Sequence, residues 1–399
     1  YLTFAKPLSA TLFPQSLPTV STVHIVNLRL RQSPSGKEII RGKIYPMDLA
    51  DFHYDLPDNL IGQTAIEPRD SCKLLVVDRR HHTLSHHIFR DLTQILDSNT
   101  VLVINDTKVF PARLYGHKDT GGKIEILLLK QIRLDTYRGL VRGKVKLQTQ
   151  INISQEFRCS VESIESDGEV ILQFNVGGIS LLEKIDEYGK TPLPPYIHSQ
   201  AKEQTLRQQY QTVYAREKGS AAAPTAGLHF TETLLASLEA KGIEIVRVTL
   251  HVGLGTFKPV TPKQVASKTL HTESFYLSPE NAQKLNNAKE LGKKIIAVGT
   301  TSCRLLETLA NKKGFLRAGG GETDIFIQPG YKFKFIDGLI TNFHLPSTSL
   351  LMLVSALTLE PNTVDKITTF AESLMGKAYQ EAIKNEYKFF SFGDAMLIV

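Results

Sequence analysis

The sequence has few cysteines and no long apolar run, and these two absences exclude several classes of protein. Only three cysteines occur in 399 residues, and they are scattered, which argues against a disulfide framework and for a reducing compartment such as the cytoplasm. No stretch approaches the roughly 18 apolar residues that a spanning helix needs, so no membrane role is expected. Neither CxxC nor HExxH occurs, so a structural or protease-type zinc site has no support.

Most of the chain also lacks a strong charge of either sign. The formal net charge is +7, but residues 1–46 hold six Lys or Arg and one Glu, which leaves 41 basic and 39 acidic residues elsewhere. A nucleic-acid partner therefore needs a local basic patch as its argument, not the overall charge. The length predicts two domains, and 42% hydrophobic residues are ordinary for a globular protein.

Residues 1–46 differ from the rest of the chain. They are rich in Ser, Pro and Thr, lack helical periodicity, and precede the first methionine, Met47. A targeting segment and translated upstream sequence that is not native are both open interpretations. Each predicts a poorly ordered extension.

From Met47 onward, the pattern predicts a larger mixed α/β domain with an inserted small antiparallel β-barrel domain. Closely spaced short strands that suggest the barrel lie at 124–129, 140–147, 151–153, 158–164 and 169–174. Buried strands of the α/β part are expected at 73–78, 101–104, 243–250, 294–298 and 339–343, and helices at 231–241, 279–291 and 349–357. The expected division is an α/β domain at 47–118 and 192–399 and a barrel at 119–191.

The stretch 218–230 is the first candidate for a ligand site. It consists of small residues, including Thr225 and Gly227, and leads into the helix expected from 231. Such a loop lets a ligand approach bare backbone N–H groups at a helix N-terminus. His229 lies at the exit of this loop.

Other candidates follow the buried strands, where open α/β sheets bind their ligands. They are Asn105, Asp106, Thr107, Arg113, Thr300, Thr301, Arg304, Thr341, Asn342 and His344. Each of these residues is weak evidence for a ligand site when taken alone, because a Thr at a strand–turn–helix corner more often caps the helix than binds a ligand.

A second histidine-bearing stretch begins at His251. Three small residues follow it closely, namely Gly253, Gly255 and Thr256. Glycines here permit either close approach to a ligand or a bend in the strand, and the spacing is not GxGxxG, which leaves a nicotinamide cofactor with little support. Further on, His271 and Glu273 share one face of an extended segment, as an acid/base pair or as a solvated edge.

Two pairs of adjacent histidines raise the question of a metal-binding site. His81–His82 and His86–His87 lie across an expected turn among arginines. Hydrogen-bond acceptors that would orient metal-bound imidazoles are not evident, so a polar hairpin is predicted and no metal ligand.

Many ordered segments match a known pattern. They are 51–57, 104–109, 111–114, 121–128, 193–197, 210–215, 218–230, 251–260, 297–304, 341–347 and 390–396. Through them the chain from Met47 to Val399 resembles the S-adenosylmethionine:tRNA ribosyltransferase-isomerase family of queuosine biosynthesis. One departure is that Tyr137 and Arg138 stand where relatives often carry Trp, a residue absent from this chain.

The resemblance implies a reaction and its partners. S-adenosylmethionine would be a ribosyl donor and co-substrate, with no prosthetic group, and the other substrate would be tRNA bearing 7-aminomethyl-7-deazaguanine at the wobble position. The products would be epoxyqueuosine-tRNA, adenine and methionine. The implied fold, an α/β domain with a barrel insert, agrees with the pattern above, and a monomer is expected.

This chemistry needs at least one base and one acid with pKa values near the working pH. We expect His229 and His251 to face each other across one pocket as that pair. Glu273 is expected to orient His271 or to act in its place.

The binding roles are expectations of the same kind. The substrate candidates are the polar strand-end residues above, with Thr300, Thr301 and Arg304 at the methionine carboxylate. The basic residues expected to contact tRNA are Arg69, Lys108, Arg113, Lys123, Arg216 and Lys218. Two other functions stay open, an S-adenosylmethionine-dependent RNA methyltransferase and a non-catalytic RNA-binding protein. Against them stand the lack of a glycine-rich first-strand corner and the concentration of His in loops.

Overall fold

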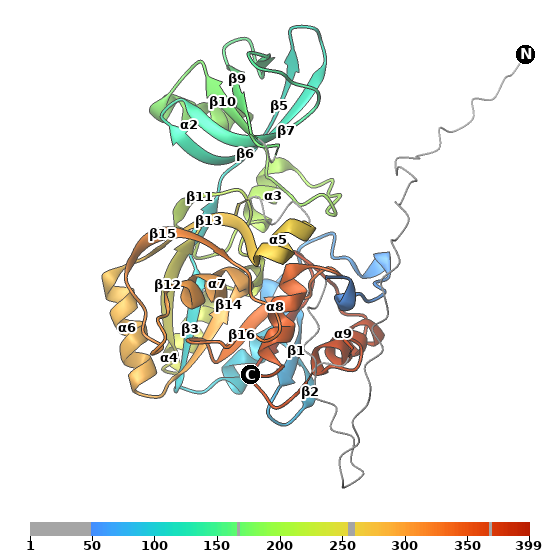
Figure 1. Ribbon diagram of the computed structural model, residues 1–399, viewed down its shortest axis with the longest axis vertical. Helices are drawn as coiled ribbons and strands as arrows, with labels where there is room; N and C mark the ends of the chain where they lie inside the picture. The colour runs from blue at the N-terminus through green and yellow to red at the C-terminus, as the bar shows by residue number, and fades with distance from the viewer. Residues whose placement is uncertain (1–48, 166–167, 254–259, 367–368) are drawn as a thin grey trace, which may run out of the picture. The chain divides into compact units, whose positions relative to one another are not determined.

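The computed structural model describes residues 49–399 except 166–167, 254–259 and 367–368. The predictions for 1–46, Gly255 and Thr256 therefore lie outside the described residues. The described chain contains a large mixed sheet with helices and a closed antiparallel barrel, which confirms the predicted fold class (Figure 1).

A nine-stranded sheet organises the larger part of the described chain. Its spatial order is β15 (Gly319–Ile325), β13 (Thr269–Leu277), β12 (Glu244–Leu250), β3 (Thr100–Asn105), β14 (Lys294–Val298), β16 (Gly338–Asn342), β17 (Ala395–Ile398), β1 (Lys73–Asp78) and β2 (Thr83–Ile88). Strands β12, β3, β14 and β16 run parallel, whereas β13 and β15 pair antiparallel at one edge. The parallel strands therefore end at one shared edge, where ligands bind in open α/β sheets.

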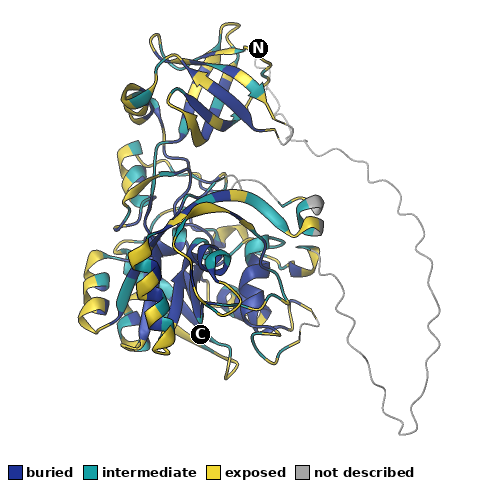
Figure 2. Ribbon diagram, turned by 60° about the vertical axis from the view of Figure 1, so that its left-hand side comes forward, coloured by how far each residue is buried: buried dark blue, intermediate teal, exposed yellow. Residues whose placement is uncertain are grey.

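Alternate residues of the central strands enter two different cores. Val101 and Val103 share one apolar cluster with residues of α6 (Pro279–Glu290), α7 (Gly299–Leu309), α8 (Ser349–Leu357) and α9 (Leu374–Lys384). Leu102 and Ile104 share the other with α1 (Leu92–Ile95) and α4 (Glu232–Ala240). Figure 2 shows the buried strands between these helices. Burial on both faces explains why the strands read as continuous apolar runs.

The barrel has a core of its own. Its strands, in the closed order β10-β7-β6-β5-β8-β9, are β5 (Arg113–Lys118), β6 (Lys123–Arg133), β7 (Thr136–Arg142), β8 (Gln150–Asn152), β9 (Arg158–Ile164) and β10 (Val170–Phe174). Helix α2 (Gly178–Tyr188) adds Leu181 and Ile185 to this core. Strand β5 was not expected from the pattern, and the exact limits of the two domains stay a prediction.

A short parallel pair, β4 (Thr107–Val109) and β11 (Glu217–Ser220), lies where no strand was expected. Its pairing joins residues about a hundred positions apart, which local periodicity cannot reveal. The remaining elements are α3 (Glu203–Gln209), α5 (Pro262–Ser267) and the 3₁₀ turns η1 (Leu49–Phe52), η2 (Asp58–Leu60), η3 (Arg69–Ser71), η4 (Phe89–Asp91) and η5 (Thr225–His229). Across the described residues, no helix combines the length and apolar character needed to span a bilayer.

Candidate functional site

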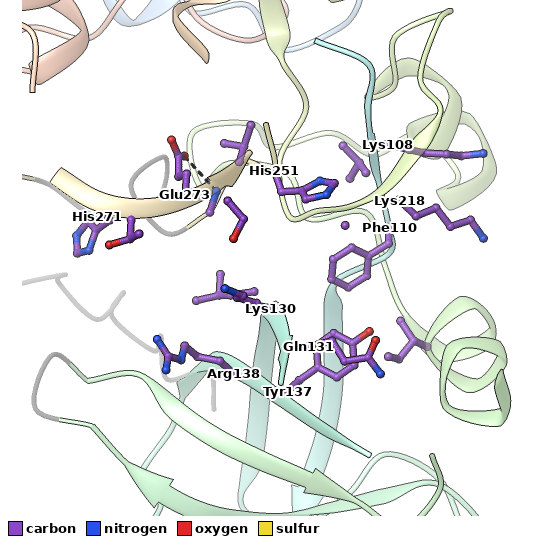
Figure 3. Close-up of a pocket in the computed structure, with 18 of the residues that line it drawn as sticks. Lys108, Phe110, Lys130, Gln131, Tyr137, Arg138, Lys218, His251, His271 and Glu273 are labelled. Atoms are coloured by element: carbon purple, nitrogen blue, oxygen red, sulfur yellow. Dashed lines mark hydrogen bonds between the residues drawn. The ribbon is translucent and has the colours of Figure 1, made fainter. Parts of the chain in front are cut away.

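A cavity of about 800 Å³ opens between the barrel and the edge of the large sheet. This volume falls within the roughly 300–1,000 Å³ of small-molecule sites. Figure 3 shows His251, His271 and Glu273 on the sheet side, with Lys130, Tyr137 and Arg138 facing them from the barrel. Of the sequence-predicted residues, those among the described lining are Lys108, Lys218, His251, Gly253, His271 and Glu273.

The His251 ring is held at the cavity wall from two sides. Its Nδ1 lies 2.8 Å from Thr107 Oγ1, whose hydroxyl is also 3.5 Å from the Glu217 carbonyl. Gly219 lies against the ring, because a Cβ at this glycine would be 2.9–3.0 Å from three ring atoms. With a φ of +150°, Gly219 also has a backbone conformation that L-residues rarely adopt.

The electrostatic surroundings keep His251 neutral. Burial lowers the pKa of the imidazole and outweighs the nearby carboxylates of Asp106 and Glu217, which raise it. When the Thr107 hydroxyl donates to the Glu217 carbonyl, it accepts from Nδ1–H of His251. Nε2 of the neutral ring then remains an acceptor of a proton.

Glu273 lies on β13 two residues after His271, and both line the cavity. Its carboxylate accepts a hydrogen bond from the Gly253 N–H at 3.2 Å and one from Nη1 of Arg304. Glu273 is 4% exposed and Arg304 is 7% exposed, so this is a buried ion pair. Because both oxygens are engaged, Glu273 holds the backbone that follows His251, which is a positioning role.

Arg304 and its neighbours on α7 do not join the described cavity lining. Thr301 accepts a hydrogen bond from Asn105 at 3.2 Å, and Arg304 pairs with Glu273 while its Nε and Nη2 stay buried without a partner. Thr300 is likewise absent from the described lining. The carboxylate-binding role expected for Thr300, Thr301 and Arg304 stays a prediction without a cavity to support it.

His229 does not share this cavity among the residues described. It is 4% exposed, its Nδ1 lies 3.2 Å from Cys72 Sγ, and its Nε2 lies 3.0 Å from Asn342 Nδ2. Asn342 Oδ1 accepts from Thr225 at 3.0 Å, so Nδ2 is the donor to His229. Burial lowers the pKa of His229 to about 4. His229 is therefore a neutral, buried histidine that links three segments, and the expectation that it faces His251 across one pocket stays a prediction without a shared cavity lining to support it.

Other predicted substrate residues also have structural partners. Gly227 is required because a Cβ there would lie 2.0 Å from the Tyr214 hydroxyl. His344 lies 2.9 Å from Thr341 Oγ1, and its backbone N–H donates to Tyr379 at 2.9 Å. Burial lowers the pKa of His344 to about 3, so it too is neutral. None of these side chains belongs to the described cavity lining.

Asn105 and Asp106 complete the junction of β3 with β12. The Asn105 amide uses both donors and both acceptor positions, on Leu250, Thr301 and Thr107. Asp106 is 1% exposed, accepts from Thr249 Oγ1 at 2.7 Å, and lies 3.1 Å from Arg216. Burial raises the pKa of Asp106. Neither side chain belongs to the described cavity lining.

The basic residues proposed for tRNA fall into three pairs. Arg69 donates to the carbonyls of Gln211 and Gln208 at 2.6 and 2.7 Å, and Arg113 pairs with Glu125 at 2.8 Å. These two guanidinium groups therefore hold the fold together. Arg216 pairs with Asp106 and Glu217, while Lys123 is exposed on the barrel. Lys108 and Lys218 line the cavity, and their contact with RNA stays a prediction.

The barrel side of the cavity was largely missed from sequence. Lys130 pairs with Glu322 at 2.6 Å and Arg138 with Glu169 at 3.4 Å, while Phe110 and Tyr137 present rings 6.2 Å apart. Only the departure at Tyr137 and Arg138 from the family pattern signalled this wall. The histidine pairs of the β1–β2 hairpin have local partners, such as Asp78 for His81 and Asp365 for His82. No cluster suited to a metal ion occurs in the described part of the chain.

Comparisons with known proteins cover the same region. A family model described as Queuosine biosynthesis protein matches residues 49–398. The S-adenosylmethionine:tRNA ribosyltransferase-isomerase of Clostridioides difficile is 48% identical over 356 residues, which covers 88% of this chain and 100% of that protein. The protein of the same name from Symbiobacterium thermophilum is 48% identical over 359 residues, with the same coverage. A solved structure of S-adenosylmethionine tRNA ribosyltransferase from Thermotoga maritima is 34% identical and covers 88% of this chain and 100% of that chain, with a TM-score of 0.48.

The buried His229 predicts a loss of stability in acid. At a pH above about 6.5, the pKa of a histidine in the unfolded chain, His229 is unprotonated in both the folded and the unfolded state. Between about pH 6.5 and pH 4, only the unfolded state binds the proton. The free energy of unfolding should therefore fall by about 1.4 kcal/mol per pH unit from this group over that window. Urea denaturation of wild type and His229→Gln across pH 7 to 4 measures it. An equal slope in both proteins would contradict the assignment.

The ion pair of Glu273 and Arg304 predicts a strong asymmetry between single and double variants. Glu273→Ala leaves a buried guanidinium without a counter-ion, which should cost about 3–5 kcal/mol in unfolding free energy. Replacing both partners, as Glu273→Leu with Arg304→Met, should recover most of this loss. Urea denaturation of the three proteins at pH 7 is the measurement, and a single variant as stable as wild type would refute the argument.

Proposed function

The chain belongs to the queuosine biosynthesis protein family of S-adenosylmethionine:tRNA ribosyltransferase-isomerases, and from this membership we propose the reaction that it catalyses. The enzyme transfers and isomerises the ribosyl moiety of S-adenosylmethionine onto tRNA. The acceptor is 7-aminomethyl-7-deazaguanine at the wobble position, and epoxyqueuosine-tRNA, adenine and methionine are the products. The proposed setting is the cytoplasm, with S-adenosylmethionine as co-substrate and no prosthetic group.

The observation that carries the proposal is the cavity between barrel and sheet, with two imidazoles in its lining. Its volume of about 800 Å³ suits a nucleoside sulfonium together with one nucleobase. A sulfonium acidifies the adjacent C5′ protons, so a positioned base can remove one. Adenine leaves more readily when it is protonated, and the aminomethyl nitrogen then bonds to the sugar as the epoxide forms and methionine leaves.

We assign the base to His251. Its pKa is lowered by burial, so the ring is neutral near pH 7 and has a nitrogen free to take a proton. The Thr107 hydroxyl and Gly219 fix the ring orientation. His271, the other imidazole of the described lining, replaces His229 as the proposed acid, because His229 is in the core.

The binding assignment narrows in the same way. We propose that Gly253 and the β13 residues His271 to Glu273 contact the adenosylmethionine, since they line the cavity beside His251. The carboxylate of Glu273 is fixed by Arg304 and the Gly253 N–H, so it holds the backbone of this subsite in place.

Product analysis distinguishes this proposal from a methyltransferase. Purified enzyme, S-adenosylmethionine and tRNA bearing the deazaguanine precursor should release free adenine and methionine, and nucleoside mass analysis should find epoxyqueuosine. A methyltransferase would release S-adenosylhomocysteine instead. An RNA-binding protein without activity would leave both substrates unchanged, and either result would refute the proposal.

The role of His251 predicts a defined pH profile. Because the base acts when neutral and its pKa is lowered, kcat/KM should rise with pH through a midpoint below about 6.5 and be flat near neutrality. His251→Gln should lower kcat by about 10²–10⁴-fold and abolish this acidic limb. His229→Gln serves as the matched control. Folded His229→Gln protein should still show the rise of kcat/KM with pH on the acidic side. If that rise disappears in His229→Gln and not in His251→Gln, then His229 is the base and His251 is not.

A further inference from the structure

Four cationic side chains line the cavity, and they divide into a paired and an unpaired set. Lys130 is bound to Glu322 at 2.6 Å, and the Arg138 guanidinium lies 3.4 Å from Glu169. Lys108 and Lys218 line the same cavity, but neither ammonium group has a carboxylate or hydrogen-bond partner in the described part of the chain. The unpaired positive charge of the cavity is therefore concentrated at these two lysines.

The fold places the two unpaired lysines next to each other. In the parallel pair of β4 and β11, Lys218 is the register partner of Lys108. Neighbouring strands lie about 4.8 Å apart, and register partners project to the same face. Figure 3 shows both side chains extending in the same direction, with the Phe110 ring on the side nearer the centre of the cavity. Like charges directly opposite each other destabilise a strand pair, so this arrangement suits an anion bound between the ammonium groups.

An aromatic wall lies immediately beside the lysines. Phe110 follows β4 and, with Tyr137 of the barrel, contributes rings whose centroids are 6.2 Å apart at an interplanar angle of 45°. Leu182 and Ile185 of α2 continue this apolar surface. Aromatic faces stack on unpaired bases of any sequence, and lysines bind the backbone phosphates of the same strand.

We infer that Lys108 and Lys218 bind a backbone phosphate of the tRNA and that Phe110, with Tyr137 behind it, stacks on the splayed nucleobase. This inference rests on the proposed function, since it names where that substrate sits. It divides the cavity into two subsites. The nucleotide lies at the end marked by β4, β11 and Phe110, and the adenosylmethionine lies along β13. His251, which packs against Gly219 next to Lys218, lies between them.

Binding without turnover tests the lysines. The affinity for an unmodified anticodon stem-loop RNA is measured by fluorescence anisotropy between about 50 and 200 mM salt. Lys108→Ala and Lys218→Ala should each weaken binding about tenfold. The slope of log K against log salt should become shallower by about 0.7 for each phosphate that the variant no longer neutralises. Lys108→Arg should retain most of the affinity.

The stacking surface and the charge control are tested alongside. Phe110→Leu keeps an apolar side chain but removes the aromatic face, so it should weaken RNA binding about tenfold without changing the salt slope. Lys312→Ala is the charge-matched control, because Lys312 is exposed in the turn after α7, outside the described lining, and the variant should bind RNA as wild type does.

The outcomes separate this inference from the proposed function. Lys108→Ala and Lys218→Ala proteins that bind RNA like wild type, or a Lys312→Ala loss as large as theirs, would overturn the phosphate site. Lysine variants with a raised KM for S-adenosylmethionine and unchanged RNA affinity would overturn the division into subsites. In each of these cases wild-type protein would still make epoxyqueuosine-tRNA. A wild-type protein that makes none contradicts the proposed function itself.

Discussion

The site depends on the side chain of Asn105, which joins two strand ends. Strand β3 pairs with β12 up to Asn105, and beyond that point the amide takes over from the backbone ladder. It donates to the Leu250 carbonyl at 2.9 Å and accepts from the Leu250 N–H at 3.0 Å, while its remaining bonds reach Thr107 and Thr301. His251 directly follows Leu250, the last residue of β12. The Asn105 side chain thus keeps the segment that leads from β3 to the barrel beside the His251 ring, which lines the cavity.

The elements that were predicted from sequence are those that one local pattern determines. Strands such as β3 and β14 are buried on both faces, so their apolar runs identify them without any knowledge of their neighbours. The closely spaced short strands of the barrel were recognisable for a similar reason. Because parallel strands end at one edge, polar residues after them were reasonable candidates, and His251 and Gly253 do reach the cavity.

The features that could not be predicted rest on interactions between distant segments. The loops before His229 and after His251 look alike in sequence, with small residues and glycines around a histidine. Their difference arises from Cys72 and Asn342, which bind the His229 ring from other parts of the chain. The residues of the barrel wall could also hardly be predicted from the sequence. Register and irregular pairing with β7 determine which side chains of the long strand β6 face the cavity.

The barrel is a closed unit with a separate core, and it supplies one complete wall of the cavity. Mutations that drift through β6, β7 and α2 can remodel that wall while leaving the sheet edge, and the hydrogen bonds around His251, undisturbed. Under the proposed function, variation in which polynucleotide is accepted can accumulate in the barrel without damage to the sheet edge that carries the proposed base. An inserted domain of this kind allows acceptor specificity to change during evolution while the residues at the sheet edge stay the same.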